Sequence, residues 1–280
     1  MKGKLEMLLP ITSIPTWSRG NIDMQYENNP LTDVIFRIDL DKPVAGSKKL
    51  TDDFYNLIKS VFPKRAIVQG TVLHGQIVAQ KDGTKFTQSQ QKVTNYRFWD
   101  ENQKKTLMLE PSTDINLVFK VYKNSKELKD VINLIVDSII KVYGDITIKR
   151  TGLRYINEIV IQEGNPFDWR PFINRSLISS LDFRSEEDKL SRSMGIMELL
   201  RDTHKVLFQF GMYNPEYPNS ISRKAFILDF DCYTEAPLNT SDIKGTIEML
   251  QKDEESLFER SIEDGLREKM VVVVDDRRSN

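Results

Sequence analysis

The chain passes twice through one order of segments: a strand, a helix, three strands and a longer helix. In the first pass, alternating apolar residues predict a strand over 31–40, and apolar residues at helical spacing predict helices over 51–63 and 125–143. The strand-like runs between these helices span residues 66–80, 93–103 and 105–122.

The second pass begins with a strand over 148–162, followed by a helix over 168–178, and ends with a helix over 240–262. The strand-like runs between these helices span residues 191–201, 204–214 and 224–235. The two passes share their element order but show no residue-level identity. The order predicts an α+β protein with two similarly ordered halves, which form a curved, mainly antiparallel sheet with helices on one face.

The same pattern divides the chain into four segments. The predicted segments are an N-terminal arm over 1–28, a first α+β half over 29–145, a second α+β half over 146–270 and a C-terminal tail over 271–280. Pro10, Pro15 and Gly20 interrupt the first segment, so we expect it to be extended rather than regular.

Composition excludes several classes of protein. With 39% hydrophobic and 29% charged residues, the chain has the composition of an ordinary protein with a packed core. The net charge of −1 argues against a dedicated DNA-coating protein, although a local basic patch remains open. The chain has one cysteine, no apolar run near the roughly 20 residues that cross a bilayer, and no cleavage-like signal pattern at its start. We therefore expect a cytoplasmic protein without a membrane partner.

One strand carries an unusual set of charges. Arg150, Arg154 and Glu158 recur at every fourth position, which places them on one face of a strand, whereas Leu153 and Tyr155 point to the other face. Alternation on the other strands adds further charged residues to the same sheet face if the sheet is continuous, namely Asp33, Arg37, Asp39, Arg97, Asp229 and Asp231.

Three interpretations of this charged face stay open: a solvated face laced with ion pairs, a recognition surface for a partner or a phosphate-bearing ligand, and a metal site built from carboxylates. An arginine fork makes two hydrogen bonds to a phosphate or carboxylate. Arg150 and Arg154 are therefore the first candidates for binding, assisted by Arg37 and Arg97, with Glu158 beside them. A structural alternative pairs each of the first two arginines with Asp229 or Asp231.

Catalytic and metal-binding signals are weak. Asp229 and Asp231 can face one cation, and with Glu158 they suggest a metal-dependent phosphodiesterase or nuclease as a rival function. Zinc is disfavoured, because His74 and His204 are the only histidines and neither has Cys or Glu at ligand spacing. We expect no cofactor and no catalytic residue.

Two further features concern partners. Trp99 shares the polar side of its strand with Arg97, where an aromatic ring can stack on a nucleic-acid base. The alternation of its strand places Cys232 on the apolar face, where we expect an unreactive thiol packed in the core. The valine run 271–274 predicts an apolar strand, and an exposed strand of this kind usually pairs with another strand or is covered. A homodimer that covers it is therefore one expected arrangement.

Several motifs occur in a characteristic order. They are "NNPLTDVIFRIDL", with the pattern NPLxxVxF, then "YRFWDENQ", "RTGLRYINEIVI", "ILDFDCYTE" and "FERSIEDGLREKM". Together they resemble a family of sporadically distributed, largely uncharacterised bacterial and archaeal proteins, and the most specific pieces are Asn29-Pro30-Leu31 and the GLRYIN stretch from Gly152 to Asn157. The resemblance implies no defined activity. Its patchy distribution is typical of mobile defence islands and toxin–antitoxin loci.

The sequence therefore predicts a non-catalytic binding or regulatory protein, with a component of an antiviral-defence or toxin–antitoxin system as the first context. A protein partner on the polar sheet face is the leading form of this hypothesis. A nucleic acid or nucleotide ligand is the second, and the metal-dependent enzyme is the rival class.

Overall fold

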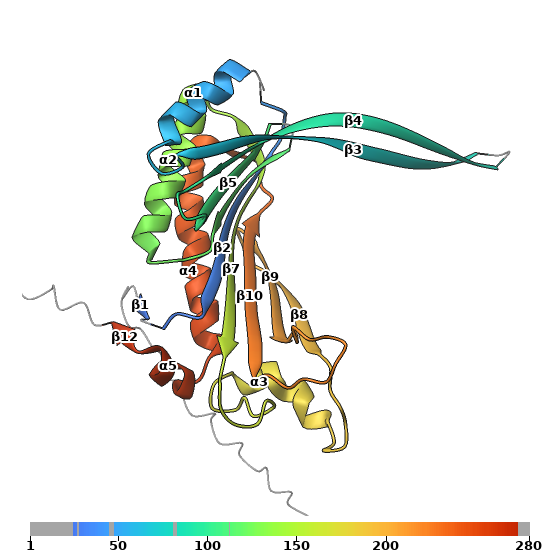
Figure 1. The fold of residues 1–280 in the computed structure, drawn as a ribbon, viewed down its shortest axis with the longest axis vertical. Helices are drawn as coiled ribbons and strands as arrows, with labels where there is room; N and C mark the ends of the chain where they lie inside the picture. Colours follow the sequence, from blue (N-terminus) through green and yellow to red (C-terminus); the bar gives the residue numbers. More distant parts are fainter. Residues whose placement is uncertain (1–24, 27, 45–47, 81–82, 112, 274–280) are drawn as a thin grey trace, which may run out of the picture.

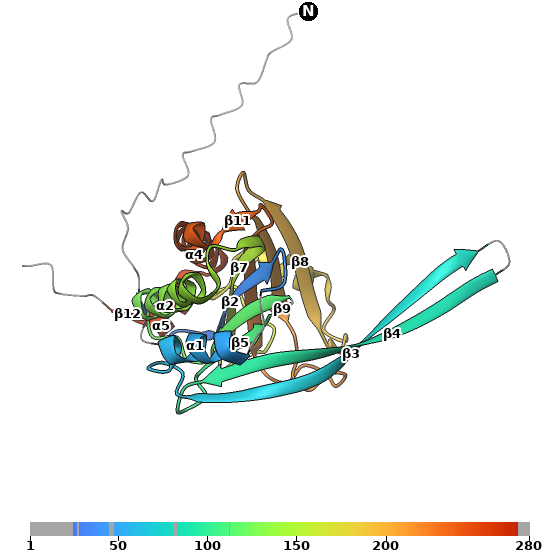
Figure 2. The same ribbon diagram turned by 90° about the horizontal axis from the view of Figure 1, so that it is seen from above.

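The fold is α+β and consists of one open, antiparallel sheet with helices packed on one of its faces (Figures 1 and 2). A computed structural model describes residues 25–273 apart from 27, 45–47, 81–82 and 112. Most of the predicted N-terminal arm and C-terminal tail, residues 1–24 and 274–280, therefore lies outside the described residues.

The sheet joins the two halves of the chain through their first strands. The strands are β2 (Leu31–Leu40), β3 (Lys64–Gln80), β4 (Gly83–Trp99), β5 (Lys105–Glu110), β6 (Asp114–Phe119), β7 (Thr147–Val160), β8 (Ser193–Leu200), β9 (Lys205–Met212), β10 (Ala225–Thr234) and the short β11 (Leu238–Asn239). The spatial order is β3-β4-β5-β6-β2-β7-β10-β9-β8, and β11 pairs with β7. In each half the last long strand returns to pair with the first, β6 with β2 and β10 with β7. The predicted pair of similarly ordered halves in one sheet is confirmed.

The first half contains one strand more than predicted. The run 105–122 is not one strand but two, β5 and β6, which pair antiparallel from Glu110↔Asp114 outward. Thr113 N donates to Glu110 O at 3.1 Å, and Pro111 has no N–H to continue a ladder. The polar residues of this turn separate the two strands.

The helices predicted over 125–143 and 240–262 are confirmed to within three residues, whereas the helix predicted over 51–63 is shifted to Lys48–Ile58. The helices are α1 (Lys48–Ile58), α2 (Ser125–Tyr143), α3 (Arg175–Ile178), α4 (Ile243–Ser261) and α5 (Asp264–Met270), with 3-10 turns over Ser179–Phe183 and Thr240–Asp242. Asn124 caps α2 by accepting from Glu127 N, and Gly144 ends it with φ 81°. The helix predicted over 168–178 is wrong in length: only α3 is helical, because Asn174 accepts from Ser176 N and caps it there.

One hydrophobic core lies between the sheet and the helices. The alternation predicted for β2 is confirmed, since Val34, Phe36, Ile38 and Leu40 are all buried. α1 packs against α2, and α4 packs across β7 and β10. No helix within the described residues combines the length and apolar character needed to span a bilayer.

The two ends of the described chain meet. β1 (Gln25–Tyr26) pairs antiparallel with β12 (Val272–Val273), and Tyr26 Oη donates to Glu259 at 2.6 Å. Val272 and Val273 of the valine run thus pair within their own chain. A homodimer stays a prediction, but this strand no longer supplies a reason for it.

β3 and β4 form a two-stranded ribbon that projects far beyond the body, on the side away from the helices (Figures 1 and 2). β5 pairs with β4 only over Tyr96–Trp99. The thirteen residues of β4 from Gly83 to Asn95 therefore pair with β3 alone and span about 43 Å at about 3.3 Å per residue. Residues 64–99 contain six Lys and Arg but one Asp, a net charge of +5, which leaves −6 on the rest of a chain whose total is −1.

Candidate functional site

The sheet face opposite the helices, called here the open face, carries the charged residues singled out by the sequence. Pairing register places them together: Asp231 lies opposite Arg154, which lies opposite Ile35, and Asp39 lies opposite Arg150. Eight acidic and six basic residues of the sheet body point to this face by register: Asp33, Asp39, Glu110, Asp114, Glu158, Glu198, Asp229 and Asp231, with Arg37, Lys64, Arg97, Arg150, Arg154 and Lys205. The open face is therefore acidic on balance.

Two ion pairs link the adjacent strands β7 and β10 at its centre. Arg154 donates from Nε and Nη2 to the two carboxylate oxygens of Asp229, at 2.7 and 2.6 Å. Arg150 donates to Asp231 at 3.0 Å, and its guanidinium lies 4.4 Å from the centre of the Tyr233 ring. We call these two pairs the arginine clamps. Each guanidinium is already engaged by a carboxylate, which is the geometry of the structural alternative.

The charges in the clamps are mutually dependent. The hydrogen bonds to Asp229 raise the pKa of Arg154 above its usual range. Burial raises the pKa of Asp231, and the charges of Arg150 and Arg154 oppose that rise. Because the side chain of Asp229 is only 8% exposed, removing its arginine would leave a carboxylate with little solvent.

The remaining predicted residues lie around the clamps rather than in one pocket with them. Arg37 donates to Asp39 at 2.5 Å and to Asp114 at 3.4 Å, with its side chain 44% exposed. Glu158 accepts from Tyr213 Oη at 2.5 Å, and burial together with this bond raises the pKa of Tyr213 to about 12.

Arg97 and Trp99 lie apart from the other candidates. The Arg97 guanidinium is 5.7 Å from the Trp99 ring centre, on β4. Three strands, β5, β6 and β2, separate β4 from β7, so the distance to the clamps is about 19 Å at about 4.8 Å per strand. These residues do not form a single site with Arg150 and Arg154.

The carboxylates of the open face do not converge on a cation position. Asp229 and Asp231 are held by different arginines, and Glu158 lies opposite Ile227 on β10. Among the described residues, the one group of three or more His, Cys, Asp or Glu side chains close enough to share a metal ion is elsewhere. It consists of His204, Cys232 and Asp253.

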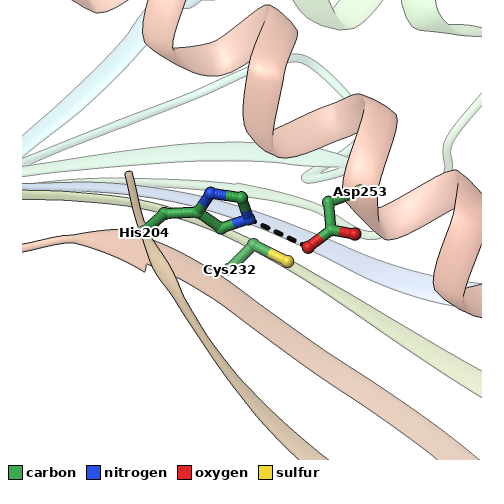
Figure 3. Close-up of side chains that lie close together, drawn as sticks. All are labelled: His204, Cys232 and Asp253. Atoms are coloured by element: carbon green, nitrogen blue, oxygen red, sulfur yellow. Dashed lines mark hydrogen bonds and ion pairs between the residues drawn. The ribbon is translucent and has the colours of Figure 1, made fainter. Parts of the chain in front are cut away.

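This group, called here the covered cluster, lies on the helix side of the sheet. Figure 3 shows the three side chains directed toward one another from the turn before β9, from β10 and from α4. Their ligand atoms all lie within 4.8 Å of one another, and His204 Nε2 is 2.9 Å from Asp253 Oδ2. Cys232 is fully buried.

Arg201 and Thr203 lie beside the covered cluster. Arg201 donates from Nε to Asp253 Oδ2 at 3.0 Å and from Nη2 to Oδ1 at 3.4 Å, and Thr203 Oγ1 lies 3.2 Å from His204 Nδ1. Burial alone would raise the pKa of Asp253, but the bonds from Arg201 and His204 outweigh it and lower that pKa.

Glu254 is the least satisfied member of this neighbourhood. Its side chain is fully buried; Oε1 accepts from Cys232 N at 3.3 Å, and Oε2 has no hydrogen-bond partner. Burial raises the pKa of the Glu254 carboxyl, and burial beside Glu254 raises the pKa of the Cys232 thiol. The thiol is therefore protonated in the metal-free protein and is not an activated nucleophile.

The spacing of these residues along the sequence did not predict the covered cluster. The residues lie 28 and 21 positions apart along the chain, unlike the short repeats of zinc motifs. The pairing of β9 with β10, which sets Val206 opposite Cys232, brings His204 close, and the packing of α4 supplies Asp253. The side chain of the second histidine, His74, lies outside those that the structure describes.

Comparison with known proteins does not suggest a function for this chain. No protein-family model matches the chain, and no curated protein matches it. The family resemblance remains an expectation from the motifs.

The far edge of the open face differs in character from its centre. β8 pairs with β9, and no other described strand pairs with its outer edge. Three apolar side chains on its open-face side are exposed: Met194 at 41%, Ile196 at 67% and Leu200 at 74%. We call them the β8 row.

Proposed function

We propose that this chain is a non-catalytic binding protein that recognises a protein partner through the open face of its sheet. The observation that carries the proposal is the β8 row. The three apolar side chains are exposed on a strand whose outer edge pairs with no other described strand, and proteins usually cover such an edge because it recruits other strands.

The arginine clamps have a supporting role in this proposal. Because Asp229 holds Arg154 through two hydrogen bonds and Asp231 accepts from Nη2 of Arg150, an anionic ligand would have to compete with a carboxylate at each arginine. The clamps instead hold β7 and β10 in register, and the exposed residues of the open face make the contacts.

The partner's chemistry follows from charge and from the free edge. An extended segment can add to β8 as a further strand and place alternate apolar side chains against the β8 row. Basic side chains on that segment complement the excess of acidic residues on the open face. A defence or toxin–antitoxin system, expected from the resemblance, is one setting for such a partner.

The test compares two aspartate substitutions at exposed apolar positions. Ile196→Asp alters the β8 row, whereas Ile67→Asp alters a side chain of similar exposure, 55%, at the ribbon base. We expect wild type and Ile67→Asp to retain one defined host protein through crosslinking and purification, and Ile196→Asp to lose it. Equal retention by both variants, with equal melting temperatures, would rule out the β8 row.

A second candidate function, nucleic-acid binding, is favoured by the ribbon. A two-stranded β-ribbon fits the major groove of DNA, and the net charge of +5 over residues 64–99 suits a polyanion. Rival phosphodiesterase chemistry lacks comparable support, because Asp229 and Asp231 are engaged by arginines.

Removal of the ribbon tests this second candidate. Gln69 lies opposite Thr94, so residues 70–93 can be replaced by Asn-Gly, a two-residue hairpin turn. If the ribbon binds nucleic acid, the shortened protein loses salt-dependent affinity for duplex DNA or RNA while it still retains the partner lost by Ile196→Asp. Unchanged affinity would exclude the ribbon.

A further inference from the structure

The covered cluster has the donor set of a transition-metal site. An imidazole nitrogen, a thiol sulfur and a carboxylate oxygen are the three ligand types that zinc takes in proteins. Zinc bonds of about 2.0–2.3 Å in a tetrahedron separate ligand atoms by about 3.3–3.6 Å. All three ligand atoms lie within 4.8 Å of one another, so a small closure brings them onto one ion.

One contact must open slightly for the ion to enter. His204 Nε2 and Asp253 Oδ2 are 2.9 Å apart, in a direct hydrogen bond. Both atoms can bind the same zinc ion when this distance grows by about 0.4 Å, to the separation set by tetrahedral geometry. The existing bond shows that the imidazole and the carboxylate already face a shared point.

The groups around the cluster act as supports for its ligands. Thr203 Oγ1 lies 3.2 Å from His204 Nδ1, the ring nitrogen that a metal-bound histidine uses for an outer hydrogen bond. Arg201 holds both carboxylate oxygens of Asp253 and so fixes its orientation. Its positive charge also opposes a cation, which should weaken the site.

Glu254 supplies an independent sign of a missing partner. Its fully buried carboxyl contacts Cys232, yet Oε2 makes no hydrogen bond. An unpartnered buried carboxyl oxygen is costly, so this position beside Cys232 favours a further polar or charged partner.

We propose that His204, Cys232 and Asp253 bind a zinc ion, with the buried carboxyl of Glu254 beside Cys232. The site ties the turn before β9, strand β10 and helix α4 together. Its thiol is fully buried, so the role is structural rather than catalytic. Cys232 binds as thiolate, and its proton passes to solvent as the ion enters.

Cobalt provides a spectroscopic test, because a cysteine thiolate bound to Co²⁺ gives a charge-transfer band. The full-length protein is stripped with a chelator and titrated with Co²⁺, then with Zn²⁺ as competitor. We expect one equivalent of Co²⁺ to bind with that band in wild type, and Zn²⁺ to displace it. Cys232→Ser should lose the band, and Asp253→Asn should bind at least about tenfold more weakly.

Two further variants separate a metal site from a merely structural cluster. Asp202→Asn makes the same chemical change as Asp253→Asn, but at an exposed position in the turn that carries His204, and should bind Co²⁺ like wild type. His204→Gln removes the imidazole ligand and should bind Co²⁺ at least about tenfold more weakly. A wild type without the thiolate band, or a band unchanged in Cys232→Ser, would overturn the proposal. If Cys232→Ser fails to fold, the weaker binding expected for Asp253→Asn and His204→Gln decides it, and affinities equal to that of Asp202→Asn would overturn it.

Discussion

Strand β10 carries one polar cluster on each of its faces, and the two are partnered very differently. On the open face, Asp229 and Asp231 each meet an arginine of β7. On the covered face, Cys232 lies among His204, Asp253 and Glu254, and one oxygen of Glu254 has no partner. The carboxylates of the open face are paired within the sheet, and on the covered face Asp253 is paired as well, with Arg201 and His204, so the unpartnered atom there is Oε2 of Glu254.

This difference separates residues that hold a fold from residues that are prepared for a ligand. Asp229 is matched by the bidentate Arg154 and belongs to no group of three potential metal ligands among the described residues. The covered cluster, in contrast, brings three potential metal ligands together beside a buried carboxyl oxygen, Glu254 Oε2, that has no hydrogen-bond partner. The comparison assigns a framework role to the arginine clamps and a binding role to the covered cluster, and the following predictions test each side.

The largest effect is expected at the Arg154–Asp229 clamp. Arg154→Met leaves a carboxylate that is 8% exposed without its partner, so the free energy of unfolding should fall by about 3–5 kcal/mol. Urea denaturation measures it. Adding Asp229→Asn should recover part of the loss, because the amide carries no charge. A single variant as stable as wild type would show that the clamp is dispensable.

Zinc should stabilise the covered side by a somewhat smaller amount. At a free concentration 100 times the dissociation constant, a ligand that binds only the native state adds about 2.7 kcal/mol to the free energy of unfolding. Wild type should show this gain in urea denaturation, and Cys232→Ser should not. Stabilisation of both proteins alike would place the ion elsewhere.

The Arg150–Asp231 clamp should show a pH-dependent effect. Arg150→Met should cost about 1–3 kcal/mol at neutral pH, because the charge of Arg150 lowers a pKa of Asp231 that burial raises. Without Arg150, the pKa of Asp231 in the folded protein rises further. The free energy of unfolding of the variant is therefore lowered at a pH where the aspartate ionises in the unfolded chain. Below the ordinary pKa of an aspartate, both states are protonated and the difference should vanish. Unfolding curves at several pH values test this, and a constant difference would contradict it.

The smallest effect is expected at Arg37. Its side chain is 44% exposed, so its ion pairs with Asp39 and Asp114 are screened by water. Arg37→Ala should change the free energy of unfolding by about 0–1 kcal/mol, with the loss shrinking in high salt. A loss as large as that of Arg154→Met would show that exposure does not distinguish these arginines.

The sequence predicts the fold well because each element depends on local periodicity. Alternation in β2 and the helical stripe of α2 identify their buried faces, and the order of elements predicts one sheet with helices on one side. The errors lie where short polar turns interrupt a pattern, as at Pro111 between β5 and β6 and at Asn174 before α3.

The candidate sites were less predictable because they depend on contacts between distant segments. Alternation assigns Arg154 and Asp229 to one face, but only the register of β7 against β10 shows that they engage each other. The covered cluster requires both a strand register and the position of α4, which brings Asp253 to His204 across 49 residues of sequence. Neither is encoded in a local motif.

A native mass spectrum of wild type and Cys232→Ser after zinc addition is the most direct test of the contrast between the two faces of β10. The account predicts that wild type gains the mass of one zinc ion and that Cys232→Ser, with both arginine clamps intact, gains none. A wild type that takes up no zinc, or a variant that takes up the same amount, would contradict it.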